Sequence, residues 1–161
     1  MSPRPLEIAE LASLLPPKAR LIGVDLGAKT IGLALSDVER RIASPLLTIA
    51  RTKFAADARQ LIAQIEEFDV FALIVGMPLN MEGTDGPRSQ STRAFLRNLS
   101  QLSPIPTAFW DERFSTAAVQ RSLIANDVSR ARRAEVVDKM AAAYILQGAL
   151  DRLAGIATRG G

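Results

Sequence analysis

The spacing of hydrophobic positions predicts three strands in the first third of the chain. Residues 21–26 (LIGVDL) are apolar on both faces, as expected of a central strand that is covered on both sides. Residues 30–37 (TIGLALSD) alternate apolar residues with small or polar ones, which predicts an antiparallel partner strand across a turn at Gly27. A third strand is expected within residues 42–50.

Beyond residue 50, helical and strand periods alternate. Helices are expected at 53–68 and 89–102, and strands at 70–80 and 105–113. A helix capped by Ser115 or Thr116 should end near residue 126, and a last helix should span about 129–153. An antiparallel meander that leads into parallel crossovers predicts an α/β fold, a mixed sheet with helices on both faces.

Both ends of the chain are expected to lie outside this domain. Residues 1–20 read as a helical extension and linker, 21–153 as the domain, and 154–161 as a flexible tail. A chain of 161 residues that is 48% hydrophobic is the size of one ordinary domain with a real core. No apolar run approaches the length of a membrane span, so we expect a cytoplasmic protein.

Two missing residue types restrict the chemistry more than the charge does. The formal charge of +3 is only mildly basic, which is compatible with a polyanionic partner. The chain has no cysteine and no histidine, which excludes disulfides, a thiolate nucleophile, a Ser-His-Asp triad and the usual nitrogen and sulfur zinc sites. A bound metal would be held by oxygen, and Mg²⁺ or Mn²⁺ prefers such ligands.

Residues 23–30 (GVDLGAKT) come close to a phosphate-binding P-loop, with Ala28 in place of the second glycine. A P-loop leads into a helix, whereas the segment after Thr30 has a strand period. The carboxylate of Asp25 would also repel a phosphate held in the loop. The P-loop interpretation is therefore rejected, and Asp25 needs another explanation.

Asp25 lies at the end of an apolar strand, on the same face as Leu21 and Gly23. A buried charge there costs several kcal/mol unless it is paired or bound to a metal. Hydrogen bonds from the amides of the turn at 27–29 are one explanation, and a metal ion is the other.

Asp138 lies on the apolar stripe of the last helix. The residues at helical spacing after it are small or apolar: Ala141, Ala142, Ile145 and Ala149. Alanines let a helix approach a sheet closely, which would bring Asp138 toward the strand ends. A structural role, capping the helix or pairing with a nearby cation, is the alternative.

Asp111 and Glu112 follow one another at the end of the last strand, so they point to opposite faces. At most one of them can easily join Asp25, and the strand period alone does not say which. Arg113 beside them could neutralise a carboxylate, bind a phosphate or form a plain surface ion pair.

Together these acids are expected at the carboxyl ends of two parallel strands and on a helix beside them, where open α/β sheets bind ligands. Carboxylates that converge without cations repel one another, and divalent metal removes that repulsion. Two such ions about 4 Å apart can activate a water and stabilise the leaving oxygen of a phosphodiester without any histidine.

The chain resembles the YqgF family, also called RuvX, of pre-16S ribosomal RNA nucleases and Holliday-junction-resolvase-like proteins. The resemblance is carried by four ordered stretches: GVDLGAKTIGLALSD, VGMPLNMEGTDG, WDERFST and VDKMAAAYILQGALD. It implies a ribonuclease H-like fold with strand order 3-2-1-4-5. It also implies a catalytic Mg²⁺ or Mn²⁺ site on Asp25, Asp138 and an acid of the DER triplet, with Glu112 favoured over Asp111. Trimming the 5′ end of the small-subunit ribosomal RNA precursor is the implied activity, and junction resolution is the alternative.

Polar residues around this site are candidates for binding a nucleic-acid backbone, although a merely solvated loop at 80–90 and a soluble basic run at 130–133 remain open. The candidates are Lys29, Asn80, Thr84, Arg88, Arg113, Arg130, Arg132 and Arg133. The expected partner is structured RNA, with branched DNA and ribosomal particles as alternatives, and a monomer and a homodimer are both open.

Two other functions fit parts of the pattern. The stretch DLGAKTIG is also similar to the phosphate motif of actin-like phosphotransferases. Those enzymes close two such domains over a nucleotide, and this chain has the length of one. A non-catalytic RNA-binding module with the same fold is the remaining alternative.

Overall fold

The computed structural model describes residues 5–80, 82–112 and 133–160, with only the backbone described for 133–138 and 158–160. Its centre is a five-stranded sheet in the order β3-β2-β1-β4-β5. β2 runs antiparallel to both β1 and β3, and β4 runs parallel to both β1 and β5. This confirms the mixed sheet and its strand order. The strands are β1 (Arg20–Leu26), β2 (Thr30–Ser36), β3 (Ala43–Ala50), β4 (Val70–Met77) and β5 (Thr107–Asp111).

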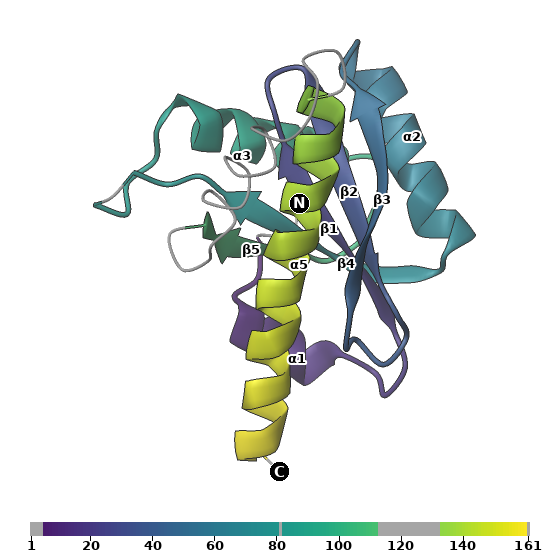
Figure 1. Cartoon of the computed structure of the whole chain (residues 1–161), viewed down its shortest axis with the longest axis vertical. Helices are drawn as coiled ribbons and strands as arrows, with labels where there is room; N and C mark the ends of the chain where they lie inside the picture. The colour runs from purple at the N-terminus through teal and green to yellow at the C-terminus, as the bar shows by residue number, and fades with distance from the viewer. Residues whose placement is uncertain (1–4, 81, 113–132, 161) are drawn as a thin grey trace.

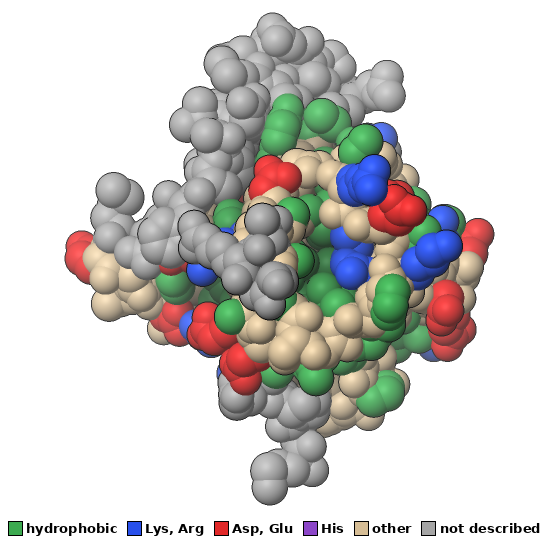
Figure 2. Space-filling model, turned by 90° about the horizontal axis from the view of Figure 1, so that it is seen from below, with side chains coloured by type: hydrophobic (Ala, Val, Ile, Leu, Met, Phe, Trp, Pro, Cys, Tyr) green, Lys and Arg blue, Asp and Glu red, His purple; other side chains and the backbone are tan. Residues whose placement is uncertain are grey.

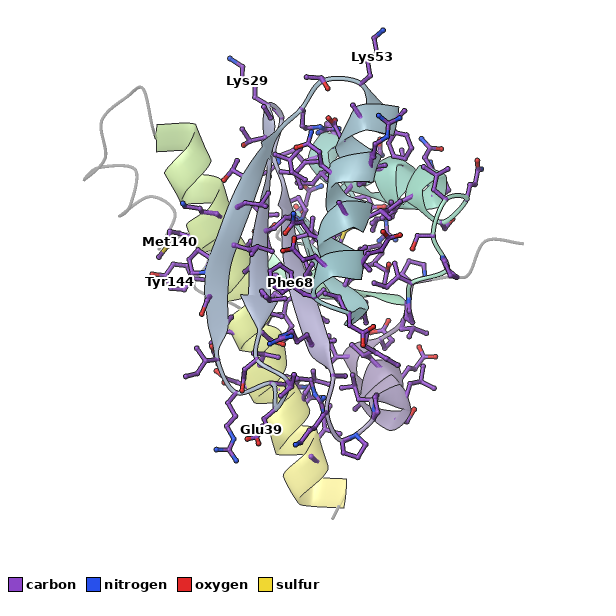
Figure 3. All side chains as sticks on the ribbon, turned by 90° about the vertical axis from the view of Figure 1, so that its right-hand side faces the viewer. Lys29, Glu39, Lys53, Phe68, Met140 and Tyr144 are labelled. Carbon is purple, nitrogen blue, oxygen red and sulfur yellow. The ribbon has the colours of Figure 1, made fainter. Side chains whose placement is uncertain are left out.

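Helices cover both faces of the sheet, as the sequence predicts. The long helix α5 crosses one face, and α2 and α3 lie on the other (Figures 1 and 3). The short helix α1 lies near the C-terminal half of α5 (Figure 1). The helices are α1 (Ile8–Leu14), α2 (Phe54–Glu67), α3 (Pro87–Leu99) and α5 (Arg133–Gly160).

Strand alternation divides the core into two layers. Leu21 belongs to the apolar cluster under α5, whereas Ile22 and Val24 belong to the cluster under α2 and α3. β1 is the middle strand, and both of its faces are buried because helices cover it on each side. This explains why its sequence is apolar throughout rather than alternating.

Gly23 lets α5 lie unusually close to the middle of β1. A Cβ at this position would be 2.7 Å from Cβ of Leu146 and 2.8 Å from the carbonyl oxygen of Ala142. Both distances are shorter than real Cβ contacts, so no larger residue fits without movement of the helix. Ala142 and the neighbouring alanines contribute from the helix side by keeping its apolar stripe thin.

The opposite layer is built mainly from α2 and α3. Asp57 near the start of α2 is buried, and its carboxylate accepts hydrogen bonds from the backbone N–H and the hydroxyl of Thr52. These bonds fix the short segment between β3 and α2 to the first turn of α2. The ring of Phe54 meets that of Phe95 on α3 edge-on at 5.2 Å, which joins the two helices.

The ends of the chain differ from the sequence interpretation. α5 continues to Gly160, so the backbone of 154–160 is helical where we expected a flexible tail. At the other end, Leu6 forms a parallel bridge with Ala108 on the outer edge of β5, and its N–H bonds the carbonyl oxygen of Thr107 at 2.7 Å. The helix expected near 115–126 lies outside the described residues.

The segment around Asp25 does not have the structure of a P-loop. The segment after residues 23–30 is the strand β2, which begins at Thr30, so the local structure is not that of a P-loop. In the described part of the chain, no helix is both long enough and apolar enough to cross a membrane.

Candidate functional site

Asp25 is the next-to-last residue of β1 and lies opposite Gly32 of β2. Because Leu21 and Gly23 face α5, the strand alternation puts Asp25 on that face as well. The residue is 1% exposed, and its Oδ2 is completely shielded from solvent. The amide of the following turn residue, Gly27, donates to the carbonyl oxygen of Thr30.

Glu112 reaches the same face from two strands away. Ala108 and Trp110 of β5 pack into the cluster under α5. Glu112 comes two residues after Trp110, immediately after the strand, so its side chain points to the same face. Glu112 is 8% exposed, and its Oε2 is shielded from solvent. Its Cδ would lie 3.4 Å from a Cβ at Gly76, the residue of β4 paired with Trp110.

Gly76 of β4 lies between Asp25 of β1 and Glu112 after β5, so the three residues cross three parallel strands. Val24 pairs with Val75, so Asp25 and Gly76 are each one position beyond that pair. Glu112 contacts the position of Gly76 from the other side. Asp25 and Glu112 therefore approach the layer under α5 from β1 and β5, near the carboxyl ends of these strands, and Gly76 on the strand between them has no side chain.

Asp111 belongs to the opposite side of the sheet. Asp111 pairs with Met77 of β4. Phe109, two residues earlier on the same face of β5, packs in the cluster under α2 and α3. Asp111 is half-buried, whereas Glu112 is buried. Of the two acids that sequence left open, the geometry brings Glu112 to the face of Asp25 and separates Asp111 from it.

Asp138 is described only through its place on the backbone of α5. Ala142, one turn later, lies over Gly23, and Gln147 bonds the N–H of Ala43 at the start of β3. Because β2 and β3 run antiparallel, the start of β3 is at the amino end of β1. α5 thus runs antiparallel to β1, and the turn that carries Asp138 lies toward the carboxyl end of the strand, where Asp25 is.

The donor chemistry of this edge suits a hard divalent ion. Asp25 and Glu112 contribute carboxylate oxygens, which Mg²⁺ and Mn²⁺ prefer, and burial would strengthen their attraction to a cation. Among the side chains that the structure describes, no three acidic groups gather closely enough to hold a metal. The expected third ligand, the side chain of Asp138, lies outside them.

The residues proposed to bind a nucleic-acid backbone take different places. Lys29 is exposed in the turn after β1 and projects from that end of the sheet (Figure 3). Arg88, at the start of α3, donates from Nη2 to the carbonyl oxygen of Leu26 at 3.3 Å. The side chains of the remaining candidates, Arg113, Arg130, Arg132 and Arg133, lie outside the described residues.

Asn80 and Thr84 bond each other. The amide Nδ2 of Asn80 donates to the hydroxyl of Thr84 at 3.1 Å, and a backbone bond of 2.9 Å joins the same two residues. Gly83 between them has φ 86° and needs the conformational freedom of glycine, whereas Gly86 is extended at φ −106°. The pair therefore closes the loop, and both side chains remain exposed at its surface.

Sequence reasoning missed Arg51 and Lys53 at this end of the molecule. Arg51 follows β3 and donates from Nη1 to the carbonyl oxygen of Gly27 at 2.7 Å. Lys53 precedes α2 and projects from the same end of the sheet as Lys29 (Figure 3). The sequence pattern could have indicated both residues. In a meander of three strands, the third strand ends at the same edge of the sheet as the first.

The opposite end of the molecule has a different character. Hydrophobic, basic and acidic side chains lie close together there (Figure 2). A groove of about 970 Å³ runs between α1, the last turns of α5 and the hairpin of Glu39 to Arg41. Arg41 pairs with Glu39 at 3.4 Å, so the charge at this end is partly balanced.

Comparison with known proteins identifies the family. The model of the RuvX family, described as "Holliday junction resolvase", matches residues 19–152. The chain belongs to the RuvX family. Relatives of this RuvX chain from Methylocella silvestris and Beijerinckia indica are 68% and 63% identical to it. The first match covers 92% of both chains, and the second covers 97% of this chain and 94% of the relative. Both relatives carry the name "Putative pre-16S rRNA nuclease".

The fold of the RuvX chain also matches a solved structure. RuvC of T. thermophilus in complex with a Holliday junction substrate superposes with a TM-score of 0.53 at 11% identity. The match covers 84% of this chain and 96% of RuvC. At that identity the likeness shows the fold alone, and together with the strand order it confirms the ribonuclease H-like fold.

Proposed function

We propose that this chain is a divalent-metal-dependent nuclease that cuts the precursor of 16S ribosomal RNA at its 5′ end. The observation that carries the proposal is that two buried acids, Asp25 and Glu112, share one face of the sheet at the ends of β1 and β5. A bound cation is one of the partners that offset the cost of burying carboxylates. The names of the relatives supply the class of substrate.

Asp25, Glu112 and Asp138 would hold the metal, and Mg²⁺ or Mn²⁺ would supply an activated water and stabilise the leaving oxygen. The chain's own contribution is positional. β1 and β5 fix two carboxylates on a rigid sheet, and the missing side chain of Gly76 leaves room for Glu112 beside Ile145 of α5. The packed layer under α5 keeps bulk water away from the shielded oxygens, which strengthens their interaction with a cation.

The substrate would approach from the solvent side of the same edge. Lys29 and Arg88 lie there and carry positive charge suited to a phosphate backbone. In this proposal the active domain is residues 21–153. Ribosomal RNA precursors are cut in the bacterial cytoplasm, so the proposal places the protein there, with assembling ribosomal particles as a candidate partner.

The test compares two substrates and three proteins. Wild type, Asp25→Asn and Asp111→Asn are each given a labelled 16S precursor RNA and a four-way DNA junction, with Mg²⁺, Mn²⁺ or EDTA. We expect cleavage of the RNA near the mature 5′ end by wild type and Asp111→Asn, only with metal, and none by Asp25→Asn. Asp111→Asn is the matched control because it removes an equal charge from the other face of the sheet.

Junction resolution is the second candidate, and the description of the family model favours it. Cleavage of the junction in preference to the RNA would establish it in place of RNA trimming. Equal cleavage by wild type and Asp25→Asn would refute the acidic site. RNA binding without metal-dependent cleavage would indicate a non-catalytic module instead.

A further inference from the structure

Two arginines reach the carboxyl end of β1 from the side of the sheet that α3 covers. Arg51 donates from Nη1 to the carbonyl oxygen of Gly27 at 2.7 Å, and Arg88 donates from Nη2 to that of Leu26 at 3.3 Å. These carbonyls belong to consecutive residues, so both guanidinium groups are anchored where β1 ends. They arrive from different elements, because Arg51 follows β3 and Arg88 begins α3.

Arg51 is held in place on several sides. Its backbone N–H bonds the carbonyl oxygen of Lys29 at 2.9 Å, and its guanidinium carbon lies 6.0 Å from the ring centre of the buried Phe95. The side chain is half-buried and anchored before any ligand arrives. A planar guanidinium that is already oriented loses little entropy when it binds a phosphate through two N–H groups.

The positive charge of this pair has no acidic partner within the described part of the chain. Among the side chains that the structure describes, no carboxylate lies within ion-pair distance of Arg51 or Arg88. Lys29 and Lys53 project from the same end of the sheet (Figure 3). This end of the sheet therefore carries four cationic side chains, and Asp25 and Glu112 lie on the face that α5 covers.

We propose that Arg51 and Arg88 form a phosphate clamp that holds the nucleic-acid backbone next to the bond being cut. The clamp rests on the proposed nuclease function, and it names the part of the substrate that this edge recognises. A strand that crosses the end of β1 would place one phosphodiester at the acidic face and a neighbouring one at the two arginines. Arg51 is then a positioning residue that contacts the substrate backbone without contacting the scissile bond.

Binding measured without cleavage tests the clamp separately from catalysis. Fluorescence anisotropy of a labelled 16S precursor fragment in EDTA is recorded over a series of KCl concentrations for wild type, Arg51→Gln and Arg88→Gln. Each variant should bind roughly fivefold to tenfold more weakly, and the slope of log Kd against log salt should fall by about one. Arg51→Lys should recover part of the affinity.

Arg41→Gln is the matched control. It removes the same charge from a residue whose side chain is 78% exposed at the opposite end of the sheet. We expect its affinity and salt slope to equal those of wild type. In the presence of metal, Arg51→Gln should raise KM more than it lowers kcat, since the clamp positions RNA and takes no part in bond cleavage.

A purely structural role of Arg51 gives a different result. If Arg51→Gln lowers the thermal midpoint but keeps the wild-type salt slope and KM, the clamp is wrong, whether or not wild type cleaves RNA. Arg88 is exposed, so Arg88→Gln decides the matter if Arg51→Gln fails to fold. Inorganic phosphate is added as a competitor at the same concentration as the phosphate groups of the RNA. If it displaces the RNA, the two arginines form a simple anion site, and the clamp is wrong. Failure of wild type to cleave any substrate contradicts the nuclease proposal, and the metal-free binding data remain interpretable.

Discussion

Gly76 lies against the carboxyl group of Glu112, and a Cβ at Gly76 would come 3.4 Å from Cδ of that residue. The same Cβ would lie 2.5 Å from Cδ1 of Ile145 on α5. The absence of a side chain at Gly76 therefore creates the space in which an acid of β5 and a helix above the sheet come together. The shape of the site depends on this glycine as well as on the acids.

Gly76→Ala should lower nuclease activity with a modest loss of stability. The new methyl group forces the flexible end of Ile145 to move and crowds the carboxyl group of Glu112. We expect a destabilisation of about 1–3 kcal/mol, as for other overpacked cores. Urea unfolding and RNA cleavage measure the two effects. Gly155→Ala on α5 is the control because nothing lies within 4 Å of its Cβ position, and it should leave both properties unchanged or improve stability.

Gly23→Ala should be more damaging than Gly76→Ala. Its Cβ would meet the backbone carbonyl of Ala142 at 2.8 Å and Cβ of Leu146 at 2.7 Å, and neither atom can move without the helix. We expect a free energy of unfolding lower by about 3 kcal/mol or more, because α5 must shift off the sheet. The same urea experiment ranks the two variants. A smaller loss for Gly23→Ala than for Gly76→Ala would show that α5 is not tightly seated on β1.

Glu112→Gln and Asp111→Asn should separate the two neighbouring acids. Glu112 shares the face of Asp25, so the amide should reduce kcat by about two orders of magnitude or more. Asp111 points to the other face, and its variant should retain wild-type kcat. Neither change should disturb the packing of the fold, since each amide has nearly the shape of the acid that it replaces. Equal losses in both variants would contradict the assignment of faces.

Asp37 should make stability depend on pH at the far end of the sheet. The N–H of Ile42, and then that of Arg41, bond its Oδ1 at 3.0 and 2.8 Å and hold the pKa of this carboxyl below its ordinary value of 3.8. A lowered pKa in the folded state means that the stabilising contribution is fully present above pH 3.8 and is lost as pH falls through the folded-state pKa.

The measurement for Asp37 is thermal unfolding of wild type and Asp37→Ala between pH 3 and pH 7. Asp37→Ala should be less stable near neutral pH, and the gap should close as the solution is acidified below pH 3.8. Glu39→Ala in the same hairpin is the control, because its exposed ion pair with Arg41 contributes little to stability. A gap that stays constant over this range would mean that the two N–H bonds do not favour the charged form.

Local patterns were enough to predict most of the fold. The alternation of Leu21, Gly23 and Asp25 correctly places the acid on one face, because a strand has a strict period of two. The long apolar stretches of β1 and β4 likewise identify the doubly covered strands of the centre. The family resemblance supplied the order of the strands.

The undecided features depend on contacts between distant segments. Asp111 and Glu112 could not be separated because Ala108 and Phe109 are both apolar, and only the packed structure shows which of them faces α5. The bridge of Leu6 to β5 joins residues about a hundred positions apart and leaves no local signal. Composition predicted disorder after residue 153, yet α5 continues there and lines the groove beside α1.

The close seating of α5 on Gly23 also affects how the chain is made. All five strands precede this helix in the sequence, so they leave the ribosome before the layer that covers one of their faces has been synthesised. Until then, Leu21, Ala72 and Ile74 form an uncovered apolar surface, the kind of surface that invites aggregation or binding by chaperones. Nascent chains that stop short of α5 should therefore depend on folding helpers, and the completed chain should not.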